Sequence, residues 1–201
     1  MLRLTLFVIT TLSFFILTSC NSSVEKSPPR EQMEFAVDTA LTDLKLFDSA
    51  TGLSYRVPAG WQDLMADYLA GTASRKADSL PVRMIRVAGD MANQVFLSLL
   101  DIRMMPDSHY RQLKINYNQL LNRQQNWNQV TAAEFYKDSL LVYQYVMSNT
   151  SQTLFRLIFF EKGLPLVQLD FRVPNSAGSP KFTKILESVI GSFETSRKLA
   201  P

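Results

Sequence analysis

The chain of 201 residues carries 21 lysine and arginine residues, 18 aspartate and glutamate residues, one histidine and one cysteine. Its apolar fraction of 46% and charged fraction of 19% exclude a collagen-like, low-complexity or wholly disordered chain. One cysteine excludes an intramolecular disulfide framework. The net charge of +3 is spread thinly, without the basic stripe that a phosphate backbone requires, so no nucleic acid partner is expected.

The amino terminus has the layout of a secretory signal. Arg3 supplies a positive start, residues 4–17 are apolar apart from Thr and Ser, and Leu17-Thr18-Ser19-Cys20 ends the stretch. The apolar stretch is shorter than the roughly 20 residues that a helix needs to cross a bilayer. The sequence therefore predicts a cleaved signal peptide over residues 1–19.

Leu17-Thr18-Ser19-Cys20 resembles the lipobox of bacterial lipoproteins, where a leucine stands three residues before a cysteine and small residues lie between them. The resemblance implies that Cys20 is acylated, becomes the mature first residue and attaches the chain to a lipid bilayer. An aspartate directly after the cysteine resembles the inner-membrane retention signal of some bacteria. This chain has Asn21 at that position, so we expect the outer membrane, and the sequence does not decide on which side of it the domain lies. A plain secretory peptide, or a free buried thiol, is the alternative.

Residues 20–33 are polar and contain Pro28-Pro29. A segment this poor in apolar groups cannot offset the entropy of ordering, so we expect the lipidated cysteine to be followed by a flexible tether. Such a tether reaches at most about 45 Å. One globular domain is predicted over residues 34–201, in which residues 34–46 fit either a short helix or a leading strand.

Strands with one short helix are predicted for the first half of this domain. The elements are a turn at 47–52, a strand at 53–57, helical turns after Trp61, a loop at 70–81, and strands at 82–87 and 94–102. An amphipathic helix then follows, capped by Asp107 or Ser108 and ending in the polar run 122–126.

The second half reads as four strands and a final helix. The strands are expected at 130–136, 140–147, 154–160 and 165–173. Ser179 as N-cap, Pro180 at the first helical position and apolar residues at helical spacing predict a helix from Pro180 to about Glu194. Short links between the strands require antiparallel hairpins.

Turn lengths also predict the register of these hairpins. A two-residue turn at Lys162-Gly163 places Ile158 opposite Val167, Arg156 opposite Leu169 and Leu154 opposite Phe171. Centring the preceding turn on Thr150 places Arg156 opposite Gln144, on the face away from Tyr143 and Tyr145.

The strand at 154–160 is apolar on both faces, and a strand of this kind is normally covered on both sides. The sequence therefore predicts an α+β fold, a three-layer α/β/α sandwich with a central, mainly antiparallel sheet and a packed C-terminal helix.

The chain offers little catalytic or metal-binding chemistry. His109 is the sole histidine, which excludes a site with two histidine ligands, and the phosphate-binding glycine motifs are absent. We predict no catalytic residues, no metal site and no cofactor. Tyr143, Tyr145 and Arg156 are the candidate binding surface, although core packing explains the tyrosines and pairing with Gln144 and carbonyls explains Arg156 equally simply.

Residues 53–61 (LSYRVPAGW) resemble the opening of PsbP-like and DcrB-like domains, where an aromatic strand runs into P-x-G-W. The middle helix, the antiparallel strands and residues 185–193 (ILESVIGSF) match the same pattern. The resemblance implies an α/β/α sandwich and a habit of binding proteins, with no shared active site.

Two classes of function follow. The favoured one is a non-catalytic envelope lipoprotein that binds, assembles or chaperones another envelope protein. The alternative is a periplasmic small-ligand-binding protein or weak hydrolase that uses carboxylates brought together in space. A pocket with converging acids would favour the alternative, and an apolar surface patch the first class.

Overall fold

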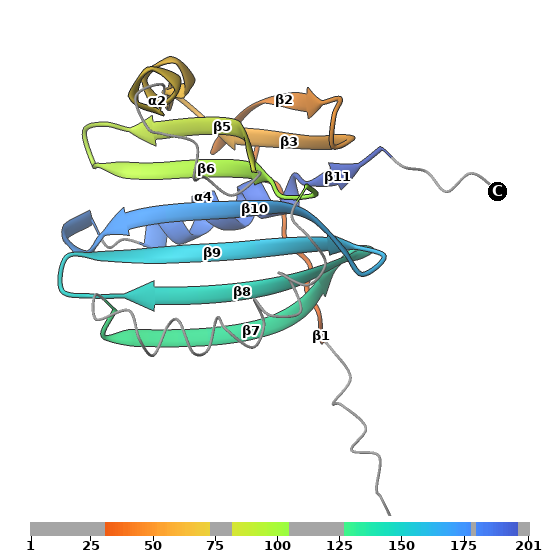
Figure 1. The fold of residues 1–201 in the computed structure, drawn as a ribbon. Helices are drawn as coiled ribbons and strands as arrows, with labels where there is room; N and C mark the ends of the chain where they lie inside the picture. Colours follow the sequence, from red (N-terminus) through yellow and green to blue (C-terminus); the bar gives the residue numbers. More distant parts are fainter. Residues whose placement is uncertain (1–30, 73–81, 105–126, 178–179, 197–201) are drawn as a thin grey trace, which may run out of the picture.

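Two sheets and two α-helices make up the described part of the chain, residues 31–72, 82–104, 127–177 and 180–196 of the computed structural model (Figure 1). The main sheet has the strand order β1-β7-β8-β9-β10-β6-β5-β4, and a smaller sheet has the order β11-β3-β2. All strand pairs are antiparallel except β1 with β7. The α+β class predicted from the sequence is confirmed.

The strands are β1 (Glu31–Gln32), β2 (Thr42–Asp48), β3 (Leu53–Pro58), β4 (Gln62–Asp63), β5 (Arg83–Asp90), β6 (Val95–Asp101), β7 (Gln129–Lys137), β8 (Leu140–Ser148), β9 (Gln152–Glu161), β10 (Leu164–Pro174) and β11 (Glu194–Thr195). The helices are α2 (Met65–Thr72), the 3₁₀ turn η1 (Asn175–Ala177) and α4 (Pro180–Gly191). These elements match the predicted strands from residue 53 onward to within a few residues.

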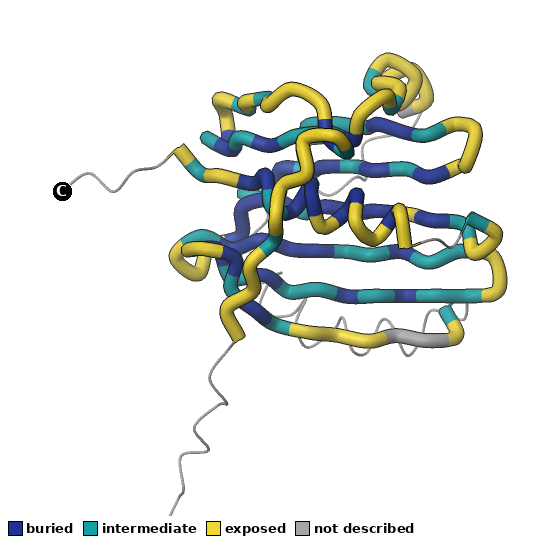
Figure 2. The backbone as a smooth tube through the Cα atoms, turned by 180° about the vertical axis from the view of Figure 1, so that it is seen from behind, coloured by how far each residue is buried: buried dark blue, intermediate teal, exposed yellow. Residues whose placement is uncertain are grey.

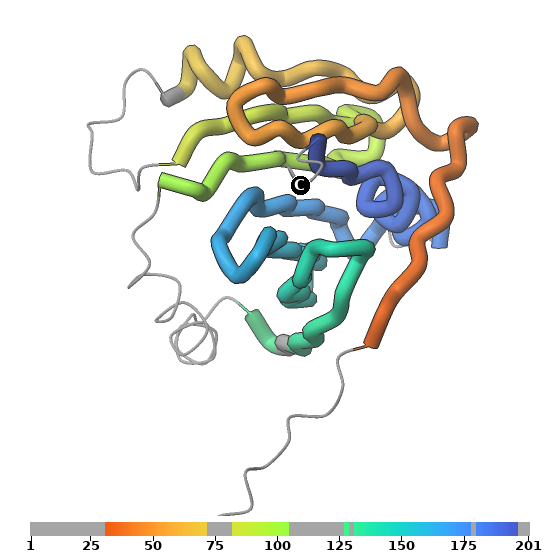
Figure 3. Tube along the Cα trace, turned by 90° about the vertical axis from the view of Figure 1, so that its right-hand side faces the viewer, coloured from red at the N-terminus to blue at the C-terminus, as the bar shows by residue number. Residues whose placement is uncertain are grey.

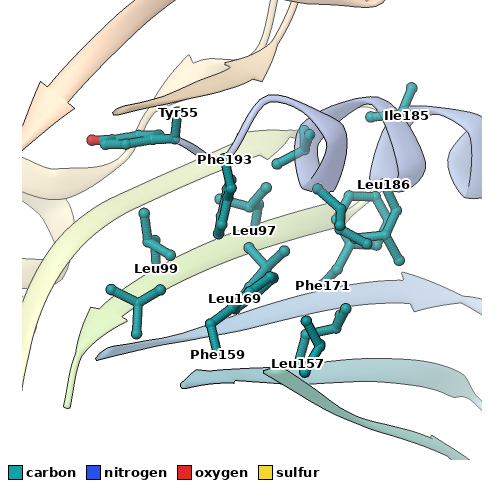
Figure 4. Close-up of a cluster of buried hydrophobic side chains, with 14 of the residues drawn as sticks. Tyr55, Leu97, Leu99, Leu157, Phe159, Leu169, Phe171, Ile185, Leu186 and Phe193 are labelled. Atoms are coloured by element: carbon teal, nitrogen blue, oxygen red, sulfur yellow. The ribbon is translucent and has the colours of Figure 1, made fainter. Parts of the chain in front are cut away.

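The larger core lies between the main sheet and a layer made by α4 and the small sheet. Alternate residues of the central strands point into it, and Figure 4 shows Ile185 and Leu186 of α4 above them. The side chains that this core buries completely include Leu53, Leu157, Phe159, Leu169 and Phe171. Burying each such side chain contributes roughly 1.5–3 kcal/mol.

A second cluster covers the opposite face of β8 and β9. Ile158 and Phe160 of β9 are 2% and 8% exposed there, and Trp127 packs against them. Strand β9 is therefore buried on both faces, as its apolar pattern predicts. The helix predicted between Asp107 and residue 126, which would supply a third layer, lies outside the described residues.

The final helix ends earlier than predicted. α4 stops at Gly191, and Glu194 belongs to β11 instead of the helix. A side chain at Gly191 would begin 2.6 Å from the backbone oxygen of Phe35, so this position requires glycine for the close approach of another segment. The predicted N-cap, Ser179, lies outside the described residues.

That other segment is the N-terminal strap, residues 31–41, which runs over the outside of α4 (Figures 2 and 3). Its first two residues form β1, and Ser188 Oγ of α4 both accepts a hydrogen bond from Asp38 N at 2.8 Å and donates one to Asp38 O at 3.1 Å. Glu31 and Gln32, which the sequence analysis places in the tether, pair with β7 as strand β1.

The predicted register between β9 and β10 holds only at the turn. Lys162 and Gly163 both have positive φ and connect Glu161 to its partner Leu164, as predicted. Beyond Pro165 one extra residue, Leu166, shifts the ladder, so Val167 pairs with Phe159 instead of Ile158. Proline has no N–H to donate and occurs in sheets at such bulges, which explains the shift.

The predicted register between β8 and β9 is wrong by one residue. Arg156 pairs with Tyr145, not Gln144, because the turn contains four residues instead of being centred on Thr150. Asn149 fixes this turn: its N–H bonds to Gln152 O at 3.0 Å, and its side-chain oxygen accepts from Ser151 N at 2.9 Å. The shift moves Arg156 to the face that carries Tyr143 and Tyr145.

Candidate functional site

The structure brings all three residues of the predicted binding surface together. Tyr145 lies directly opposite Arg156, and Tyr143 opposite Ile158, on the face of the main sheet away from α4. Tyr145 is only 5% exposed, and the ring of Tyr143 packs 4.8 Å from that of Phe160. Both tyrosines therefore pack within the second cluster, which matches the core-packing alternative.

Arg156 is held by Asp170 of β10. Its Nε donates to Oδ1 at 2.7 Å and its Nη2 to Oδ2 at 2.5 Å, and Gln168 Nε2 donates to the same carboxylate at 3.1 Å. The two charged side chains are 27% and 17% exposed. A two-point pair of this kind fixes the guanidinium within the sheet.

A second charged group, which the sequence did not reveal, lies where the two sheets meet. We call it the arginine network: Asp48 from β2, Arg83 from β5, Asp101 from β6 and Arg103. Arg83 donates to Asp48 at 3.1 and 2.7 Å and to Asp101 at 3.4 and 3.2 Å. Arg103 donates to Asp101 at 2.9 and 2.8 Å. The network links the edge of the small sheet to the main sheet.

Hydrogen bonding outweighs burial at both carboxylates. Burial alone would raise the pKa of Asp48, but hydrogen bonds from Arg83 and Thr51 lower it from 3.8 to about 2. Burial likewise acts to raise the pKa of Asp101, while the hydrogen bonds and charges of Arg103 and Arg83 bring it below its usual value. Both acids are therefore ionised at neutral pH and are occupied as acceptors.

Exposed apolar side chains stand next to the network in sequence. Phe47, 59% exposed, precedes Asp48, and Met104, 73% exposed, follows Arg103. The arginine side chains of Arg83 and Arg103 are 45% and 30% exposed. In the sequence, the available signal was an acid, Asp101, at the end of a mostly apolar strand.

One described cavity, of about 110 Å³, lies between β9, β10, η1 and the start of α4. Its lining includes Phe155, Val173 and Phe182, together with Thr153, Asn175 and Thr183. The volume is below the roughly 300–1,000 Å³ of typical ligand pockets, and its lining has no acidic residue.

The described residues also bear on metal binding and on membrane-spanning helices. Among these, no group of three or more His, Cys, Asp and Glu side chains could hold a metal ion. None of the helices in these ranges has the length and apolar character to cross a membrane. Cys20, the predicted signal peptide and His109 lie outside them.

Comparison with known proteins found matches among solved structures. No protein-family model matches the chain, and no curated protein does. Among solved structures, the chain is similar to the 1.9 Å crystal structure of the Ran-binding protein Mog1p of Saccharomyces cerevisiae, with a TM-score of 0.40 and 10% identity, covering 80% of this chain and 96% of that one. At this identity, Ran binding is a property of that protein alone.

Proposed function

We propose that the chain is an envelope lipoprotein of the PsbP-like and DcrB-like type whose domain binds another envelope protein without catalysing a reaction. The observation that carries the binding part is the arginine network: two partly exposed guanidinium groups are fixed by carboxylates, and the exposed residues Phe47 and Met104 adjoin Asp48 and Arg103 in the sequence. Arginine and aromatic residues dominate the binding energy of protein interfaces.

Fixed arginines are suited to this role. A free arginine loses about 0.5–1.5 kcal/mol of side-chain freedom when an interface immobilises it. Asp48 and Asp101 already impose that order on Arg83, which makes four hydrogen bonds to them. A partner with carbonyl or carboxylate oxygens and an apolar side chain would therefore bind a surface that is already organised.

The proposed lipid anchor would favour partners that lie at the same membrane. Leu17-Thr18-Ser19-Cys20 supports acylation at Cys20, and the N-terminal strap fixes the chain to α4 and β7 from Glu31 onward. The intervening segment then spans at most about 40 Å at 3.3–3.6 Å per residue. Confinement of this kind raises the effective concentration toward proteins in the same membrane.

The anchor is tested by replacing Cys20→Ala in the native host. We expect loss of the acyl mass, of processing at residue 20 and of partition into detergent, because the thiol is the group that lipid alkylates. Unchanged mass and membrane association would refute the lipoprotein assignment and leave the binding proposal to its own test.

The binding part is tested by crosslinking the tagged, full-length protein in native membranes and purifying it. We expect one stoichiometric envelope partner, whose recovery falls at least tenfold in Phe47→Ala. The matched control is Leu44→Ala, which alters a side chain on the same strand that is 82% exposed and not adjacent to the network. Equal recovery with both variants would place the interface elsewhere.

The same purified protein also tests the alternative of a small-ligand-binding protein or weak hydrolase. Native mass spectrometry without a protein partner but with a bound small molecule would favour it. The cavity beside Phe155 and Phe182 is where such a molecule would be sought.

A further inference from the structure

Within the described residues, the outer edge of β7 is unpaired along most of its length. β1 pairs with it only at Phe135 and Tyr136, and no other described strand lies on that side. Figure 2 shows β7 as the outermost long strand, and Thr131, Ala132 and Ala133 are exposed. Unpaired backbone groups at such an edge accept another strand.

The other described edges carry the features that block strand addition. β4 and β11 have two residues each, and β4 carries Asp63, which pairs with Arg86. β2 is longer, but it has a register irregularity between Thr42 and Lys45 and carries charged side chains. β5, which β4 pairs only at Ala88 and Gly89, carries Arg83 and Arg86 and has a register irregularity between Met84 and Arg86. Short length, charge and bulges are the usual protections of edge strands.

β7 has none of these protections over residues 129–133, which read QVTAA. The segment has no charge and no proline, and its register with β8 is regular from Gln129 to Lys137. Proline does occur upstream of β1, where Pro28-Pro29 cannot donate the N–H groups needed to extend β1 along the edge. The described part of β1 pairs with Phe135 and Tyr136 and not with residues 129–133.

We propose that residues 129–133 of β7 pair antiparallel with the same residues of a second copy of this chain, joining two main sheets across a two-fold axis. This proposal is independent of the proposed function. The hydrogen bond from Met33 N to Tyr136 O, 2.8 Å long, shows that Tyr136 points its backbone groups outward. Because the strand has a period of two, the backbone N–H and C=O groups of Val130 and Ala132 also point outward.

Only a few registers satisfy this geometry. Outward residues must pair with outward residues, and β1 already occupies the edge at Phe135 and Tyr136. Pairing Val130 with Ala132 of the other copy includes all of residues 129–133, and the paired stretch ends before the positions that β1 occupies. Shifting the two-fold axis to Ala132 would place Gln129 opposite Phe135, where β1 lies.

The second copy is the occupant because this register is self-complementary. Thr131 faces Thr131 of the other copy at a non-hydrogen-bonded position, and threonine pairs there stabilise antiparallel strands. No charged residues oppose each other within the paired stretch. The two-fold pairing also covers both open edges at once, so assembly stops at a dimer.

Disulfide trapping in the full-length, membrane-bound protein tests the register. In this register, Thr131→Cys puts the Cα atoms of the two cysteines about 4.5 Å apart, which is within the range for a disulfide. We expect oxidation to give a dimer of the chain with this variant. Ala132→Cys and Ala133→Cys are the matched controls, because each faces a different residue of the other copy, and we expect them to stay at the level of the parent chain.

Adding Ala132→Pro to Thr131→Cys removes one outward N–H while leaving the inward bonds to β8, and should reduce the trapped dimer at least tenfold. As a control, circular dichroism and thermal melting test whether the Ala132→Pro variant still folds. No dimer with Thr131→Cys, equal dimer at all three cysteine positions, or a disulfide to a different protein would each overturn the proposal.

Discussion

Asp101 holds two arginines from a position that is only 3% exposed. Replacing Asp101→Asn removes the charge that pairs with Arg83 and Arg103 and leaves part of a buried polar group without matched partners. We expect a loss of about 1–3 kcal/mol in the free energy of unfolding, the cost of an unsatisfied buried group. The urea midpoint, with an unchanged denaturant slope, measures this loss.

A matched control exists on β4. Asp63 also pairs with an arginine, Arg86, but its side chain is 55% exposed. Asp63→Asn should therefore change the free energy of unfolding by no more than about 1 kcal/mol, as for surface ion pairs. Equal effects of the two substitutions would show that burial does not determine how much Asp101 contributes to the free energy of unfolding.

Arg156 shows where residue-level prediction failed. Its presence in an apolar strand was visible in the sequence, and the sheet it joins was predicted correctly. Its partner was not, because one extra residue at Leu166 and a four-residue turn at 149–152 changed both registers. Neither follows from the sequence pattern, because the turn depends on the hydrogen bonds of Asn149 and the bulge depends on packing between strands.

At the scale of elements, Gly191 is where α4 meets the N-terminal strap. Gly191→Ala would put a Cβ atom 2.6 Å from Phe35 O, so the strap must move away from the helix. We expect destabilisation of about 1–3 kcal/mol, as for overpacked contacts, and faster amide hydrogen exchange in residues 31–41. Thermal melting and exchange measured by mass spectrometry provide the two readings.

Gly71 in α2 is the control for this change, since a Cβ atom there meets nothing within 4 Å. Gly71→Ala should be neutral or stabilising by up to about 1 kcal/mol, because alanine is the better helix former. If Gly191→Ala were equally harmless, the strap would have to be loosely attached.

The strap also marks the limit of prediction for elements. α4 follows from its apolar period. The apolar residues at helical spacing between Pro180 and Glu194 are all buried, and the last of them, Phe193, lies just beyond the end of α4: Phe182, Ile185, Leu186, Val189, Ile190 and Phe193. Residues 34–46 fit either a helix or a strand in the sequence, since their conformation depends on contacts such as Asp38 with Ser188, 150 residues away in sequence. Local propensity cannot reveal a partner so distant.

At the scale of the whole molecule, the sequence predicted the α+β architecture but not that three strands form a separate sheet. β3 alternates like a strand of the main sheet, yet it pairs with β2 and β11. The two sheets are joined by the shared core and, at their ends, by the arginine network. Neither the sheet division nor the network follows from periodicity, because both depend on which strand edges meet.

The network should make the joint between the sheets sensitive to acid. The pKa of Asp48 is about 2 in the folded chain and near 3.8 when unfolded, so its contribution is complete above the unfolded pKa and is lost as pH falls toward 2. Asp101 has a lowered pKa as well and acts in the same direction. We therefore expect the free energy of unfolding to fall between about pH 5 and pH 2.

Asp48→Asn tests this expectation by urea titration at each pH. The free energy of unfolding of this variant should be lower at neutral pH and should fall less steeply with acid, since the group that takes up the proton on unfolding is gone. Parallel curves for the two proteins would mean that Asp48 does not couple the sheets through its charge.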